Sequence, residues 1–249
     1  MTLLSTIRFS IAVALACAAV ASAGDKDKPK PSGAQLVDSG AFGVFVRGQR
    51  VVTESFSVQQ QNGVSTVKSQ LKEAAGAGPT NQKSELLMTS GAELIRYEWS
   101  DSGGSSLVVM PNNEFLLEKI TTPASNKPAE QPFMMPNTSA ILDNNFFVHR
   151  EVLAWRYLAT NCHTEKGSLQ CQQGPLEFGV LVPQDRTSLR VRLELVGREK
   201  VTINGTDRQL LRLNLSGENF NWALWVEESS PFKLMRVLIA DDHIEIVRD

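Results

Sequence analysis

Most of this chain is a series of short segments in which apolar and polar residues alternate, and turn-forming residues follow each segment. Alternation places apolar side chains on one face of an extended strand, and Gly, Asn, Asp or Pro ends the strand. Asn204-Gly205 lies between two such segments and is typical of a tight hairpin turn, because both residues tolerate positive φ. The pattern predicts about thirteen short strands, joined as antiparallel neighbours.

One segment has a different period. Between residues 138 and 158, apolar residues recur at steps of three and four, which is the spacing of one helix face. Thr138 is the expected N-cap, and so wide an apolar face must be substantially covered. The apolar face contains Ile141, Leu142, Phe146, Val148, His149, Val152, Leu153, Trp155 and Tyr157, and the polar side contains Asp143, Asn144, Arg150 and Glu151.

The proline-rich stretch 122–136 interrupts the strand pattern, because proline removes a backbone donor from a sheet. Either it separates two β halves, or the strands on both sides of it form one sheet. We expect the second arrangement, since a helix with a wide apolar face needs a concave surface around it. The expected fold is mainly β: a strongly curved antiparallel sheet, like a half-barrel, that wraps one main α-helix in a single domain over residues 40–249.

The N-terminal segment, residues 1–23, predicts export. Arg8 precedes an apolar run over residues 9–20, and Ala21-Ser22-Ala23 then supplies the small residues that a signal peptidase requires. We expect a signal peptide that is cleaved between Ala23 and Gly24. The mature protein is then periplasmic or secreted.

Residues 24–39 are rich in Lys, Pro, Ser and Gly and predict a flexible linker. The apolar run of the signal is too short to span a bilayer, so we expect no transmembrane segment in the mature chain. Lipid attachment at Cys17 is the alternative to simple cleavage. Leu15 stands one place too late for the usual lipid-attachment motif, which favours cleavage.

Charge and cysteine content exclude several classes of protein. Lys and Arg number 25 against 27 Asp and Glu, so there is no basic excess and we expect no nucleic-acid partner. Cys162 and Cys171 flank a polar loop that contains glycine, and such a pair forms a disulfide in an oxidising compartment. A metal site that also uses His163 is the alternative, but adjacent Cys and His side chains rarely converge on one ion. We expect a disulfide, no metal and no cofactor.

The sequence contains no catalytic motif. A nucleophilic serine needs an activating base, and Ser105 and Ser106 stand in a glycine-rich turn without one. The glycine-rich segments lack the Lys-Ser/Thr ending of a phosphate-binding loop. His149, on the apolar helix face, is the candidate general base in an alternative reading as a periplasmic hydrolase. We expect no catalytic residue and a protein that is not an enzyme.

Aromatic and apolar residues favour a binding function. Some of them are expected to line a hydrophobic pocket, and the alternative is that they only fill the core. Trp222 and Trp225 differ by three positions, so they point to opposite faces of their strand. The candidate ligand-binding residues are Phe146, His149, Leu153 and Trp155 on the helix and Trp225 on the strand.

Several segments resemble a group of exported bacterial β proteins. The resemblance is carried by Trp225-Val226-Glu227-Glu228 followed by Pro231-Phe232-Lys233-Leu234, by the opening Gly40-Ala41-Phe42-Gly43-Val44-Phe45-Val46-Arg47-Gly48, and by Ile141-Leu142-Asp143. That group is similar in turn to the half-barrel proteins that carry or receive lipoproteins in the Gram-negative periplasm. Those carriers are shorter and hold several helices in the cup, whereas this sequence predicts one helix and more strands.

The resemblance implies a fold that binds acyl chains or another apolar ligand. We therefore expect an exported, non-enzymatic binding or envelope-associated protein. Its partner is expected to be an apolar small molecule, a lipid or an envelope protein. The alternatives are the hydrolase that uses His149 and a structural partner in an envelope assembly.

Overall fold

A computed structural model describes residues 33–73, 81–125, 127–166 and 168–249. The expected signal peptide, its cleavage site at Ala23 and Gly24, Cys17 and most of the expected linker lie outside these residues. The described part belongs to one compact unit that begins at Ser32. Within it, no helix is long and apolar enough to cross a membrane.

The described residues form one 15-stranded sheet, a separate two-stranded hairpin and one α-helix. The elements are β1 (Gln35–Val46), β2 (Gln49–Gln61), β3 (Val64–Glu73), β4 (Gln82–Thr89), β5 (Leu94–Asp101), β6 (Ser106–Asn112), β7 (Phe115–Thr121), β8 (Ala129–Phe133), β9 (Ala140–Ile141), α1 (Val148–Asn161), β10 (Cys162–Glu165), β11 (Ser168–Cys171), β12 (Leu176–Val182), β13 (Thr187–Ile203), β14 (Thr206–Ser216), β15 (Asn221–Val226), β16 (Leu234–Ile239) and β17 (Ile244–Arg248).

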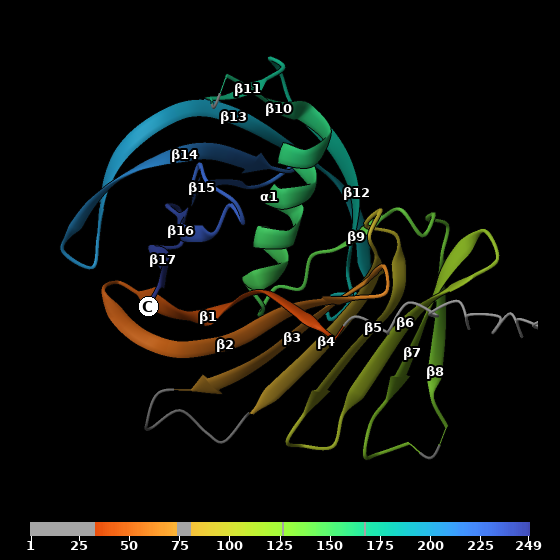
Figure 1. Ribbon diagram of the computed structural model, residues 1–249. Helices are drawn as coiled ribbons and strands as arrows, with labels where there is room; N and C mark the ends of the chain where they lie inside the picture. The colour runs from red at the N-terminus through yellow and green to blue at the C-terminus, as the bar shows by residue number, and fades with distance from the viewer. Residues whose placement is uncertain (1–32, 74–80, 126, 167) are drawn as a thin grey trace, which may run out of the picture. The chain divides into compact units, whose positions relative to one another are not determined.

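The strand order of the large sheet is β8-β7-β6-β5-β4-β3-β2-β1-β17-β16-β15-β14-β13-β12-β9. All neighbours are antiparallel except β9, which runs parallel to β12. β1 and β17 pair in the middle of the sheet, with Phe42 opposite Arg248 and Val46 opposite Ile244. The sheet therefore consists of two meanders, one from each end of the described chain, that meet at β1 and β17 (Figure 1).

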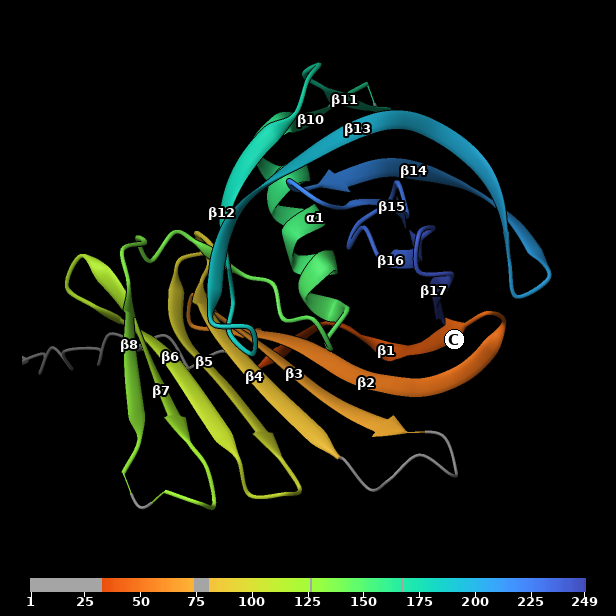
Figure 2. The same cartoon turned by 180° about the vertical axis from the view of Figure 1, so that it is seen from behind.

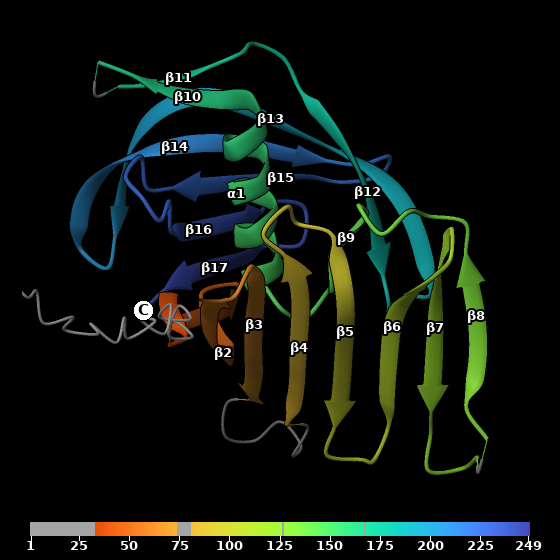
Figure 3. The same ribbon diagram turned by 45° about the vertical axis from the view of Figure 1, so that its right-hand side comes forward.

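The strands from β12 through β17 and from β1 to β4 curve around α1; we call this part the roll (Figure 1). Strands β5–β8 continue beyond it, and we call them the wing (Figure 3). The sheet is not closed into a barrel. Residues between β8 and α1 lie between β12 and the start of β5, a place that we call the seam. There the N–H of Leu94 donates to the carbonyl of Asn137 at 2.7 Å, and the N–H of Leu142 donates to the carbonyl of Leu181 at 2.9 Å.

Period-two alternation places the core on the concave side of the roll. On β13, Val191 and Leu193 are fully buried, whereas Arg190 and Arg192 are exposed. The buried side chains of the sheet and the helix form one apolar cluster around α1. A shift in register between Leu195 and Gly197 interrupts the β13–β14 pairing, and such bulges increase the bend of a strand. The expected fold class, a curved antiparallel sheet around one helix, is confirmed.

The structure corrects the expected boundaries of the elements. The helix begins at Val148 and not near Thr138, and residues 140–141 form β9. The proline-rich stretch contains β8, in which Pro132 is tolerated because β8 is an edge strand. β1 begins at Gln35, inside the expected linker.

The expected polar side of the helix is correct at Asn144, which is exposed, and wrong at the three charged residues. Asp143, Arg150 and Glu151 are buried, because the roll surrounds the helix on that side as well. Asp143 and Glu151 have partners on distant strands, and Arg150 donates to nearby backbone carbonyls, as described below.

Candidate functional site

The N-terminus of α1 is capped by a carboxylate from β2. Glu54 is fully buried and accepts hydrogen bonds from the N–H of Phe147 at 2.6 Å, the N–H of Val148 at 3.2 Å and the hydroxyl of Ser69 at 2.7 Å. The first N–H groups of a helix lack partners within the helix, and the helix dipole favours a negative charge there. Burial raises the pKa of Glu54 to about 7, although these donors favour the ionised form.

His149 lies next to this cap and is 1% exposed. The N–H of Asp143 donates to its Nδ1 at 3.3 Å, so the proton of the neutral imidazole is on Nε2. Burial, together with the charge of Arg150, lowers the pKa of His149 to about 3. The imidazole is therefore neutral at physiological pH and closed to substrate, which is not the environment of a general base.

The other groups near His149 hold the loop that precedes the helix. The hydroxyl of Tyr97 and the side-chain amide of Gln184 both donate to the carboxylate of Asp143. Arg150 donates to the backbone carbonyls of Asp143 and Phe146, the latter at 2.8 Å. Burial raises the pKa of Asp143 and lowers that of Arg150 to about 10. These hydrogen bonds satisfy the buried polar groups within the fold and join the wing, the roll and the helix.

A second buried cluster joins the middle of α1 to the centre of the sheet. Arg248 on β17 donates to Asp38 on β1 at 2.6 and 2.7 Å and to Glu151 on α1 at 3.0 Å. Burial and the neighbouring Asp38 raise the pKa of Glu151 well above its usual range. Burial acts to raise the pKa of Asp38 too, but its contacts with Glu151 and Arg248 lower it. The charge of Asp38 therefore balances that of Arg248.

Buried side chains of the helix and the sheet pack against one another in one cluster, with a small cavity beside the helix. A cavity of about 20 Å³ lies at the seam between α1, β9 and the β4–β5 turn. Its wall includes Leu86, Met88, Leu94, Leu153 and the side of His149. The volume is sufficient for about one water molecule, whereas pockets for drug-sized ligands hold hundreds of cubic ångströms.

The candidate ligand-binding residues separate into two groups. Phe146, His149 and Leu153 lie together in the core around α1, and the indole N–H of Trp155 donates to the carbonyl of Phe232 at 2.9 Å. Trp225 lies on the opposite face of β15, in a smaller apolar cluster with Val201, Ile203, Leu210 and Met235.

Trp225 is covered on that face by polar and charged neighbours. Its indole N–H donates to Glu199 at 2.9 Å, and Arg236 stacks over its ring at 4.9 Å. Trp222, in contrast, lies near Arg150 on the concave side, which confirms that the two tryptophans point to opposite faces.

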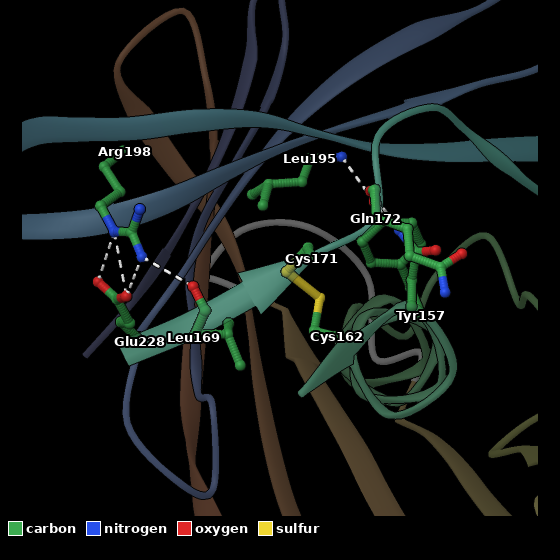
Figure 4. The surroundings of a disulfide bond; sticks show 9 residues. Tyr157, Cys162, Leu169, Cys171, Gln172, Leu195, Arg198 and Glu228 are labelled. Atoms are coloured by element: carbon green, nitrogen blue, oxygen red, sulfur yellow. Dashed lines mark hydrogen bonds and ion pairs between the residues drawn. A yellow bond between two sulfur atoms is a disulfide. The ribbon is translucent and has the colours of Figure 1, made fainter. Parts of the chain in front are cut away.

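The hairpin β10–β11 extends from the end of α1 and carries the expected disulfide. The sulfur atoms of Cys162 and Cys171 are 2.10 Å apart, and the two residues stand directly opposite each other in the β10–β11 pairing (Figure 4). Arg198 on β13 donates to Glu228 at 2.9 Å and to the carbonyl of Leu169 at 3.2 Å. These contacts hold the hairpin against the roll. Within the described residues, no three His, Cys, Asp or Glu side chains come together as a metal site would require.

An open groove lies on the outside of the roll. It has a volume of about 1060 Å³ and runs between the outer face of β12–β13 and the segment 134–139. β12 is on the side of the roll next to the wing (Figure 2). Arg156 of α1 reaches this groove from inside, where its guanidinium lies 5.3 Å from the ring of Phe178, and Arg190 and Arg192 line it from β13.

Sequence reasoning missed this groove. The alternation of Arg190 and Arg192 with buried neighbours indicates an exposed strand face, but nothing local shows that Arg156 reaches the same place.

Comparisons of the chain with protein-family models, curated proteins and solved structures give no match.

Proposed function

We propose that this protein is an exported, non-enzymatic binding protein whose partner is an envelope protein, held on the outside of the curved sheet. The observation that carries the proposal is the filled core. The cavity of about 20 Å³ beside α1 leaves no room for an acyl chain unless the seam opens. The groove of about 1060 Å³ on the outer face is open to a partner.

The burial of the candidate general base also supports a binding function. His149 is 1% exposed and its pKa is about 3, so it does not offer a base to a substrate at neutral pH. Export is supported by the apolar N-terminal run and by the disulfide, which persists in oxidising compartments. Localisation is tested by cell fractionation and intact mass, with Gly24 expected as the first residue of the mature chain.

The partner is tested by site-specific photocrosslinking in the source cells. A photoreactive residue at Arg190, inside the groove, should give one discrete crosslinked protein. The same residue at Gln60, which is exposed on β2 and is not part of the groove lining, is the matched control and should give none.

The apolar-ligand alternative is tested separately. Titration of delipidated protein with a fluorescent fatty acid should give no saturable signal. Saturable binding with no crosslink at Arg190 would replace the protein-partner proposal by a lipid-binding one.

A further inference from the structure

The floor of the groove on the outside of the roll is built from side chains. A Cβ atom at Gly179 would meet the hydroxyl of Ser139 at 3.5 Å and the terminal methyl of Met135 at 3.6 Å. The segment 135–139 therefore packs directly on β12, and β9 occupies the adjacent edge of that strand. A partner in this groove must contact the side chains of the lining, since β12 offers it no free strand edge.

Arg156 reaches the groove from α1 and separates it from the small cavity at the seam. Arg156 and Ser139 line both spaces. The guanidinium carbon of Arg156 lies 5.3 Å from the centre of the Phe178 ring, and the side chain is half-buried. The aromatic ring and the helix therefore hold the guanidinium in the wall of the groove, with part of it exposed.

This arginine has no acidic partner within the protein. Burial lowers the pKa of Arg156, and no neighbouring carboxylate of the described residues opposes that shift. A partly desolvated charge without a counter-charge costs free energy, which an incoming carboxylate would recover. The planar guanidinium binds a carboxylate through two parallel hydrogen bonds, and it does so while stacked on an aromatic ring.

The rest of the groove has the same charge preference. Arg190 has no ion pair among the described residues, whereas Arg192 donates to Glu177 at 2.9 Å. Arg156, Arg190 and Arg192 stand against Glu177 and Glu218, so the lining carries a net charge of 3 − 2 = +1. The whole chain has a net charge of −2. The groove is therefore more positive than the chain that contains it, which is complementary to an acidic partner.

An apolar side chain stands in the same lining. Met134 is 87% exposed, which is the highest value among the large apolar residues that the structure describes. Methionine is flexible and polarisable, so it adapts to an apolar surface of a partner. The groove thus offers an unpaired guanidinium together with an uncovered apolar side chain.

We propose that the groove binds an acidic and partly apolar segment of the envelope-protein partner, with one carboxylate on Arg156 and an apolar side chain against Met134. This inference rests on the proposed function and specifies its partner. Arg190 attracts the segment from its exposed position, and the charge-assisted pair with Arg156 fixes the position of the segment.

The first test is fluorescence anisotropy with the purified, disulfide-bonded protein and a labelled (Glu-Gly-Leu)3 peptide. We expect saturable binding that weakens in 0.5 M NaCl. The neutral peptide (Gln-Gly-Leu)3 should bind at least about tenfold more weakly, because the charge-assisted pair is lost. (Glu-Gly-Ser)3 should also bind more weakly, and equal binding would refute the contact with Met134.

A cycle of variants and peptides assigns the carboxylate to Arg156. Arg156→Gln should lower the affinity for (Glu-Gly-Leu)3 about tenfold or more and leave that for (Gln-Gly-Leu)3 unchanged. Arg156→Lys, which keeps the charge and loses the planar fork, should give an intermediate affinity. Arg190→Gln should lower the affinity by a smaller factor. Arg208→Gln is the matched control and should bind as the wild type does, since Arg208 pairs with Glu227 outside this groove.

A second measurement locates the peptide without altering the protein. A (Glu-Gly-Leu)3 peptide that carries photo-leucine should attach to the wild-type protein on irradiation. Mass spectrometry should place the attachment on residues 134–139 or on another part of the groove lining.

The inference is overturned if Arg156→Gln binds (Glu-Gly-Leu)3 as the wild type does, if the neutral peptide binds equally well, or if photo-leucine attaches outside the groove. It is also overturned if vesicles of anionic phospholipid, and not the peptide, bind in a manner that depends on Arg156. A cellular crosslink at Arg190 without peptide binding would refute the acidic segment and leave the proposed function intact. Loss of both signals would refute both.

Discussion

Glu54→Gln should destabilise the protein, because a single side chain caps the only helix in the described residues from a strand far along the sequence. In the wild type, both carboxylate oxygens accept from backbone N–H groups of the helix start. Glutamine has one oxygen, and its NH2 group must then face one of these two N–H donors. One donor is left without an acceptor in a fully buried place.

The expected loss follows from the contacts. A hydrogen bond to a charged group contributes about 1.5–3 kcal/mol, and a buried donor without a partner costs about 1–3 kcal/mol. Removing the buried charge offsets part of this, since burial opposes ionisation of Glu54. We expect a net decrease of about 2 kcal/mol in the free energy of unfolding at pH 8. For a domain of this size, that lowers the Tm by roughly 4–8 °C.

The measurement is thermal and urea denaturation at pH 8, followed by circular dichroism. Glu85→Gln is the matched control, because Glu85 makes an exposed pair with Lys68 at 3.5 Å. Such surface pairs contribute about 0–1 kcal/mol, so the control should lower the Tm by no more than about 4 °C. If the Tm of Glu54→Gln lies within about 1 °C of the wild-type Tm, the assignment of Glu54 as the helix cap is wrong.

Three further changes test other parts of the structure. Leu153→Ala, at a 1% exposed position, should cost about 2–5 kcal/mol in urea denaturation, whereas Leu36→Ala, at 57% exposure, should change stability by less than about 0.5 kcal/mol. Glu118 is fully buried, neither of its carboxylate oxygens has a partner in the described structure, and burial raises its pKa from 4.5 to about 7. The contribution of protonated Glu118 to stability is complete below pH 4.5 and is lost as the pH rises through 7. The Tm of the wild type should therefore fall between pH 5 and 8, and Glu118→Gln should reduce that fall. An unchanged dependence of the Tm on pH in the variant would contradict this. Reduction of the Cys162–Cys171 disulfide should lower stability by about 2–3 kcal/mol, measured by denaturation with and without a reductant, and identical curves would show that the bond does not constrain the unfolded chain.

Local patterns predicted the strands and the helix, but not the contacts that limit them. Apolar residues from 141 onward have helical spacing, yet the helix starts only at Val148. There the N–H of the preceding residue, Phe147, donates to Glu54, which lies 93 residues earlier in the sequence. Thr138 had the right chemistry for a cap and the wrong place in the fold. A cap that comes from a distant strand leaves no signal near the helix.

The buried charges show the same limit. Arg150 and Glu151 follow His149 and were expected to face water, because charged residues on a helix usually do. Arg248, the ion-pair partner of Glu151, is 97 residues away from it in the sequence, and only the pairing of β17 beside β1 brings the two together. The exposure of Arg190 and Arg192 on β13, in contrast, follows from alternation along that strand alone.

The pairing of β1 with β17 sets an order on folding. A chain that is made or threaded from its N-terminus presents residues 35–46 first and residues 244–248 almost last. Until the later strand arrives, the earlier one has an uncovered side and Asp38 has no Arg248 to neutralise it. Contacts of such long sequence separation form slowly and expose unpaired edges in the meantime. Until residues 244–248 pair with β1, the chain therefore carries an uncovered strand edge beside a buried acid that has lost its neutralising arginine.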